Sequence, residues 1–244
     1  AFLIARVIPH GAKDGRPRYR CIAAYHHQDC YEDLPAAAIS RFVTLLKQRE
    51  NAEVVRAEIQ KLQGKHGRWT QEPKLPKYPC PFTASLLGMA WCVDNGEMDP
   101  AGNPYTSGMA FAWDVLTADC SPWDERSESQ TVIDVTEPES PAYCHIQPDG
   151  CMVDAERYMR YYGYVPSDQK TRRLLHALDG IPLVTLDMID EAWLQQGREE
   201  LEGEEGLVTV VSTCGRPRAS RDVRCSYSLP GPAIVGTRTG AGYI

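Results

Sequence analysis

The chain has 244 residues, a formal net charge of −7, 43% hydrophobic residues and 24% charged residues. This balance is ordinary for a globular protein that buries a core of its own. No apolar run reaches the roughly 18 residues that a membrane-spanning helix needs, so we expect no membrane contact. The first residues, AFLIARVIPHG, lack the length and cationic start of a signal peptide, so we expect no secretion.

The nine cysteines are irregularly spaced and none forms a Cys-x-x-Cys pair. Since their number is odd, at least one thiol has no partner within the chain. In a chain of this length such a pattern is more typical of reduced, intracellular thiols than of a disulfide framework. We therefore expect a protein of the cytoplasm or of an assembled particle.

The charge is unevenly distributed along the sequence. Residues 1–79 carry 14 Lys/Arg against 8 Asp/Glu, a net charge of +6. Residues 80–213 carry 7 against 24, or −17, and residues 214–244 carry 5 against 1, or +4. Basic ends around an acidic middle can steer partners electrostatically, although they do not dictate a fold.

The N-terminal half predicts a hairpin followed by helices. AFLIARVI (1–8) and YRCIAAYHH (19–27) are rich in β-formers and predict two strands joined by a polar turn. Apolar residues at spacings of three and four predict one long helix from Pro35 to Leu62, ended by Gly64 and Gly67. A proline-rich connector precedes a second helix from Phe82 to Cys92, and MAFAWDVLTA (109–118) predicts a third.

The C-terminal half predicts short strands and helices in mixed order. TVIDV (131–135), AYCHI (142–146) and CMVDA (151–155) predict strands, the last two joined by a QPDG turn. Helices are expected over 155–165, over 167–178 with Ser167 as N-cap, and after an Asp187 cap that follows a strand at 181–186. LVTVVSTC (207–214) and VRCSYSL (223–229) predict a last hairpin.

Without regular β-α-β alternation, these elements indicate an α+β fold. We expect a mixed, mainly antiparallel sheet, built from the N- and C-terminal hairpins and packed with several helices. The proline-rich connector divides an N-terminal hairpin plus long helix (1–79) from an α+β main body that carries the C-terminal basic hairpin (80–244). The two parts can also form one domain.

The tetrapeptide Gly-Arg-Pro-Arg occurs twice, at residues 15–18 and 215–218, each time between two predicted strands. Proline stiffens such a turn, and arginines displayed there can bind phosphate or carboxylate with two hydrogen bonds each. Solvated charge at a hairpin tip is the alternative interpretation. The candidate contact residues are Arg16, Arg18, Arg20, Arg216, Arg218, Arg221 and Arg224.

The final segment VGTRTGAGYI places glycines at 236, 240 and 242. This spacing resembles the glycine-rich loop near the end of repeat-associated RNA-binding subunits of CRISPR complexes, a likeness that covers about ten residues. It implies RNA as a partner, although the acidic middle of the chain departs from that family. A flexible glycine-rich tail is the alternative, and no helix follows that would make it a dinucleotide-binding loop.

A second hypothesis concerns a thiol. Cys80 precedes a predicted helix, whose N-terminus would lower the thiol pKa, and His145 and Asp154 lie on neighbouring predicted strands. This order resembles the NlpC/P60-type thiol hydrolases and implies a Cys-His-Asp arrangement, although the Asp-Cys-Ser entry and the later histidine of that family are absent. A buried or capping Cys80 and a histidine satisfied within the sheet are the alternative.

No metal site or cofactor is predicted. Cys144, His145 and Cys151 lack the paired spacing of structural zinc, and the acidic loop at 94–103 fails the EF-hand pattern. The function we expect is that of a non-catalytic subunit of a larger assembly, such as a viral particle or a ribonucleoprotein. Its arginine-rich tips would contact other protein subunits, with nucleic acid as a further partner. A thiol hydrolase or transferase is the alternative.

Overall fold

The computed structural model describes residues 1–8, 14–27, 30, 32–64, 78–91, 107–110, 129–164 and 167–193. All of them belong to one compact unit, Ala1–Glu205, and the second unit, Gly206–Ile244, lies outside the described residues. The expected hairpin at 207–229 and the glycine-rich segment at 236–242 therefore lie outside them as well. The described part has an α+β fold, as the sequence predicts.

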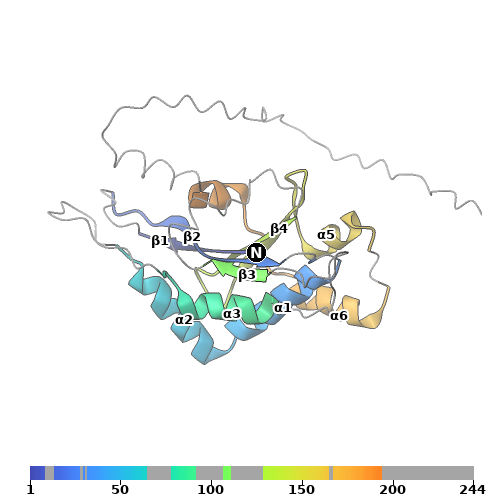
Figure 1. Cartoon of the computed structure of the whole chain (residues 1–244), viewed down its shortest axis with the longest axis horizontal. Helices are drawn as coiled ribbons and strands as arrows, with labels where there is room; N and C mark the ends of the chain where they lie inside the picture. The colour runs from blue at the N-terminus through green and yellow to red at the C-terminus, as the bar shows by residue number, and fades with distance from the viewer. Residues whose placement is uncertain are drawn as a thin grey trace, which may run out of the picture. The chain divides into compact units, whose positions relative to one another are not determined.

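A six-stranded sheet forms the centre of the described part, in the order β3-β2-β1-β4-β5-β6 (Figure 1). Neighbouring strands are antiparallel except for β1 and β4, so the sheet is mixed and mainly antiparallel. It joins strands from both sides of residue 79. The strands are β1 Phe2–Val7, β2 Arg18–His27, β3 Ser107–Ala110, β4 Gln130–Asp134, β5 Ala142–Ile146 and β6 Met152–Val153.

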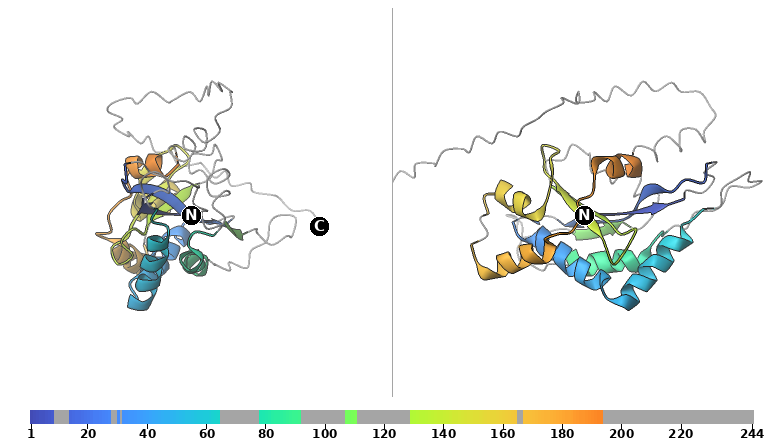
Figure 2. Two further views of the ribbon diagram at one scale, coloured as in Figure 1. Left: turned by 90° about the vertical axis from the view of Figure 1, so that its left-hand side faces the viewer. Right: turned by 180° about the vertical axis from the view of Figure 1, so that it is seen from behind.

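Both faces of the sheet are buried. On one face Leu3, Ile22 and Ile133 pack with the helices α1 to α3, α5 and α6, and on the other Ile4 and Val132 pack with a helix at residues 186–193 (Figures 1 and 2). The register of β1 against β2 shifts between Leu3 and Ile4. This bulge allows the consecutive residues Ile22 and Ala23 to join the same core.

The long helix expected over 35–62 is in fact two helices, α1 Leu34–Leu46 and α2 Arg49–Lys61. The chain turns at Gln48, whose ψ of 123° is extended. Asn51 supports the break, because its side-chain amide donates to the Leu45 carbonyl at 3.0 Å, a group that otherwise accepts only the N–H groups of the last, tightened turn, such as that of Gln48 at 3.2 Å. The apolar spacing continues across the turn, which is why it predicts a single helix.

Helix α3, Pro81–Trp91, confirms the prediction for this segment and is held at both ends by charged side chains from other helices. At its start, the buried Glu58 of α2 accepts hydrogen bonds from the Phe82 and Thr83 N–H groups, both at 2.8 Å. At its end, Arg41 of α1 donates to the Ala90 carbonyl at 2.9 and 2.6 Å. An anion at the N-terminus and a cation at the C-terminus both complement the helix dipole.

Local caps begin the two shorter helices. Asp154 caps α5, Ala155–Tyr161, and Asp168 caps α6, Gln169–Leu178, each accepting an N–H three residues ahead. The expected Ser167 cap is therefore wrong by one residue. The hydrogen bonds that Asp168 accepts from Thr171 lower its pKa to about 2. The QPDG turn before α5 closes as predicted, with Gly150 at a φ of 81°.

Two further expectations are corrected. Residues 109 and 110, where the third helix is expected to begin, belong instead to β3, because this strand pairs with the edge of β2, and 111–118 lie outside the described residues. The strand expected over 181–186 is a single parallel bridge between Tyr143 and Leu183. The helix that follows begins at residue 186, before the expected Asp187 cap, with the Thr185 hydroxyl 3.4 Å from the Met188 N–H. None of the helices in the described ranges is long and apolar enough to cross a membrane.

Candidate functional site

The first candidate is Asp14–Arg18, the described part of the connection between β1 and β2, which we call the N-terminal basic tip; residues 9–13 lie outside the described ranges. The Asp14 carboxylate accepts the Arg16 N–H at 3.0 Å and pairs with Arg18 at 3.2 Å. The Arg16 hydrogen bond is the main reason that the pKa of Asp14 is lowered. Gly15 has a φ of 62°, a conformation that glycine adopts without strain. The turn leaves Arg16 and Pro17 exposed.

Both strands that lead into the tip are fixed to other elements. On the β1 side, the Ile8 N–H donates to the Gln63 side-chain carbonyl at 2.7 Å, and the Ile8 carbonyl accepts the Gly64 N–H at 2.8 Å. On the β2 side, the Tyr19 N–H donates to the Glu191 carboxylate at 3.2 Å. The tip is thus attached to the end of α2 and to the helix at 186–193, so its base is well fixed.

A polar cluster lies beside the base of the tip. The Tyr19 hydroxyl donates to Asp134 at 3.4 Å, and the same carboxylate accepts the Thr136 hydroxyl at 2.6 Å. Burial and then the Asp134 charge raise the pKa of Tyr19 to about 12, and burial raises the pKa of Asp134. The Arg6 guanidinium lies 6.0 Å from the centre of the Tyr19 ring. These contacts join β1, β2 and β4, and we assign them a structural role.

The arginines of this region are not equivalent. Arg16 is exposed and Arg18 is tied to Asp14, but Arg20 is 2% exposed. One nitrogen of its guanidinium donates to the Tyr19 carbonyl at 3.1 Å and lies 3.5 Å from the Glu191 carbonyl. Arg20 therefore belongs to the packing between β2 and the helix at 186–193, not to the tip. The remaining candidates, Arg216, Arg218, Arg221 and Arg224, lie outside the described residues.

The thiol candidate Cys80 does lie immediately before a helix, as predicted, but it is buried. Burial and the neighbouring Glu58 charge raise the pKa of its thiol well above the ordinary value. The expected lowering by the helix N-terminus is therefore overridden. The Glu58 carboxylate already accepts hydrogen bonds from the N–H groups at this helix start, so these groups stabilise the carboxylate and not a Cys80 thiolate.

His145 and Asp154 do not form the expected arrangement with Cys80. The Nδ1 atom of the buried His145 lies 3.0 Å from the Thr131 hydroxyl, and its ring stacks on Tyr158 with centroids 4.3 Å apart. Burial lowers the pKa of His145 to about 3, and its Nε2 has no partner within the described part of the chain. Asp154 accepts the Arg157 N–H at 2.8 Å as the cap of α5. No hydrogen bond joins any two of these three candidates.

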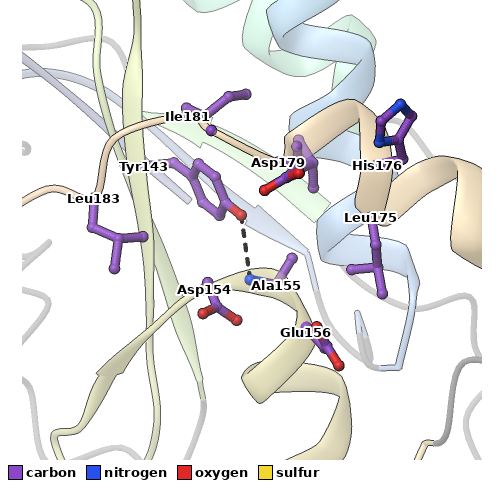
Figure 3. A pocket seen from close by; sticks show the side chains of 11 residues that line it. Tyr143, Asp154, Ala155, Glu156, Leu175, His176, Asp179, Ile181 and Leu183 are labelled. Atoms are coloured by element: carbon purple, nitrogen blue, oxygen red, sulfur yellow. Dashed lines mark hydrogen bonds between the residues drawn. The ribbon is translucent and has the colours of Figure 1, made fainter.

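The second candidate site is a recess that no sequence pattern indicates (Figure 3). It has a volume of about 450 Å³ and lies between the start of α5, the end of α6 and the segment 180–183. Tyr143 lies at its base, held by a hydrogen bond of 3.3 Å from the Ala155 N–H to the Tyr143 hydroxyl. The side chains that line it are Tyr143, Asp154, Ala155, Glu156, Leu175, His176, Leu178, Asp179, Ile181 and Leu183.

The recess combines apolar and acidic side chains. Leu175, Ile181 and Leu183 provide apolar surface, and Leu183 is 45% exposed. Asp154, Glu156 and Asp179 bring three carboxylates, and the lining contains no lysine or arginine. Nothing in the sequence indicates this recess, because it depends on the bridge that brings residue 183 beside Tyr143.

A metal centre has no support in the described ranges, where no three His, Cys, Asp or Glu side chains are placed to hold an ion. Comparison with known proteins gives no match to any family model, curated protein or solved structure.

Proposed function

We propose that this protein is a non-catalytic subunit of a larger assembly, a viral particle or a ribonucleoprotein. It contacts acidic partner surfaces or phosphate through its two arginine-rich segments. The observation that carries this proposal is the N-terminal basic tip, whose base is fixed on both strands while Arg16 and Pro17 remain exposed. Fixed strand ends of this kind reduce the conformational entropy that the residues between them lose on binding.

The charge distribution favours protein surfaces over nucleic acid as the main partner. The net charge of −17 over residues 80–213 repels a polyanion and attracts a basic tip. Because a tip on one surface and an acidic region on another form a heterologous contact, such subunits can join head to tail. We include the C-terminal arginines Arg216 and Arg218 because their sequence repeats that of the N-terminal basic tip.

The test is sizing of the purified full chain, alone and with a single-stranded oligonucleotide, at low and high ionic strength. We expect association that weakens with salt, and a further loss of about tenfold in the triple variant Arg16→Ala, Arg216→Ala, Arg218→Ala. The variant Arg49→Ala is the control, because this exposed arginine pairs with Glu53 at the start of α2, whereas the N-terminal basic tip is attached beyond the end of that helix. Association that is unchanged by salt and by the triple variant contradicts the proposal.

A further inference from the structure

The recess and the N-terminal basic tip lie at opposite ends of the described unit. The tip is attached to the end of α2 through Ile8, whereas α6, which forms one wall of the recess, lies near the start of α1, where Lys170 is 3.9 Å from Asp33. Two views agree on this placement (Figures 1 and 2). The tip of a chain therefore cannot reach the recess of the same chain.

The lining of the recess suits a cationic group attached to an apolar body. Its volume of about 450 Å³ lies in the range, roughly 300–1,000 Å³, of sites that accept a compact organic group. No lysine or arginine lines the recess, so a nucleic-acid phosphate is a poor occupant. A bare metal ion is also a poor occupant, because no suitable set of three ligands occurs in the described residues.

The three carboxylates are accessible to a new partner. Glu156 pairs with Arg160 at 2.6 Å and Asp154 with Arg157 at 3.9 Å, but all four side chains of these pairs are substantially exposed. Exchange of such pairs costs little, since exposed ion pairs contribute at most about 1 kcal/mol. Asp179 ends α6, is exposed, and has no ion pair within the described part of the chain.

We propose that this recess receives the N-terminal basic tip of a second copy of the chain. The inference rests on the proposed function and names the partner. Pro17 packs on the apolar surface of Leu175, Ile181 and Leu183, while Arg16 pairs with Asp179 and Glu156. The tip offers both chemistries at adjacent exposed positions, a stiff apolar ring and a guanidinium that can bind a carboxylate with two hydrogen bonds.

This contact joins two different surfaces, so each copy keeps a free tip at one end and an empty recess at the other. A heterologous contact of this kind continues into a ring or a filament. It also allows a test by mixing, because one copy with only a working tip and one with only a working recess should form a single pair.

The experiment uses three full-length chains: the tip variant Arg16→Glu, the recess variant Glu156→Lys with Asp179→Lys, and the wild type. Their mass distributions are measured by sedimentation velocity across a concentration series. We expect each variant alone to associate about ten to a hundred times more weakly than the wild type. An equimolar mixture of the two variants should form a heterodimer that does not grow further.

Matched controls separate the contact from general charge effects. Arg49→Glu reverses an exposed arginine, and Glu53→Lys reverses the acid of an exposed i,i+4 pair on α2, the same kind of pair as Glu156 and Arg160. Both controls should associate as the wild type does. Circular dichroism melting of every variant verifies that the fold is intact.

Three results overturn the inference: association of the recess variant like the wild type, a mixture that stays monomeric, or a wild type that is monomeric at every concentration. The proposed function is tested separately by salt dependence and by the arginine-to-alanine variants. If those weaken association while the recess variant does not, the tip binds another surface and only the inference fails. If the tip variants also have no effect, the proposed function fails with it.

Discussion

Glu58 on α2 and His145 on β5 are both buried side chains that can carry a charge, and their surroundings differ. The Glu58 carboxylate accepts three hydrogen bonds, from the Phe82 and Thr83 N–H groups and from the Thr83 hydroxyl at 2.7 Å. His145 has one hydrogen-bond partner, the Thr131 hydroxyl, and its other ring nitrogen, Nε2, has no hydrogen-bond partner among the described residues. A buried charge is tolerated where a helix start supplies its donors, whereas a sheet interior keeps its titratable group neutral.

The largest effect that sharpens this comparison is expected for Glu58→Ala. The substitution leaves three donors of α3, two of them fully buried, without an acceptor, so we expect a loss of about 3 kcal/mol or more in the free energy of unfolding. Urea denaturation of the full chain measures it.

The control for this prediction is Glu53→Ala on the same helix, where the carboxylate is exposed and the change should stay within about 0.5 kcal/mol. Glu58→Gln keeps one acceptor oxygen and should lie between the two. Equal stabilities of the Glu58 and Glu53 variants would mean that α3 does not depend on this cap.

The next effect concerns the thiol beside Glu58. Because burial and the Glu58 charge raise the pKa of Cys80, its thiolate is scarce near neutral pH. We expect iodoacetamide to alkylate Cys80 about a hundred times more slowly in the folded protein than in the unfolded chain. Peptide mass analysis of a time course measures the rate, and the partly exposed Cys151 is the internal comparison.

Rapid alkylation of Cys80 that also declines in His145→Ala would instead favour the thiol hydrolase interpretation. That result would require a second arrangement of Cys80 and His145, because the structure described above holds His145 on Thr131 and Tyr158.

The fold could be predicted where a pattern is local. Short segments rich in β-forming residues predict β1, β2, β4 and β5, and the QPDG turn predicts the β5–β6 hairpin. The break at Gln48 could not be predicted, because the apolar spacing of α1 continues into α2. Residues 109 and 110 could not be assigned either, because local apolar composition favours a helix there, whereas pairing with the distant strand β2 makes them part of a strand.

The candidate sites also differ in how far the sequence predicts them. The Gly-Arg-Pro-Arg repeat indicates the tip, and Gly15 and Asp14 form the turn that displays Arg16. The burial of Arg20 depends on Glu191, which is 171 residues away in the sequence. The acidic recess also depends on a long-range contact, the bridge between Tyr143 and Leu183. The sequence therefore shows that this half of the chain is acidic but does not show that a recess forms there.

The smallest effect is expected for His145→Phe, and it is measured as the pH dependence of the free energy of unfolding. The folded pKa of about 3 lies below the unfolded value near 6.5, so the unfolded chain binds this proton first as the pH falls. The contribution of neutral His145 to the free energy of unfolding is thus fully present above about pH 6.5 and is lost as the pH falls toward 3.

Phenylalanine keeps the stack on Tyr158 and cannot titrate. Between pH 6 and 4 the free energy of unfolding of the variant should therefore fall less steeply than that of the wild type, with slopes that differ by about 1 kcal/mol per pH unit. Groups such as Asp168, whose lowered pKa acts in the same direction, are common to both chains and cancel in the difference. Parallel stability curves for the two proteins would show that His145 is not held neutral by burial.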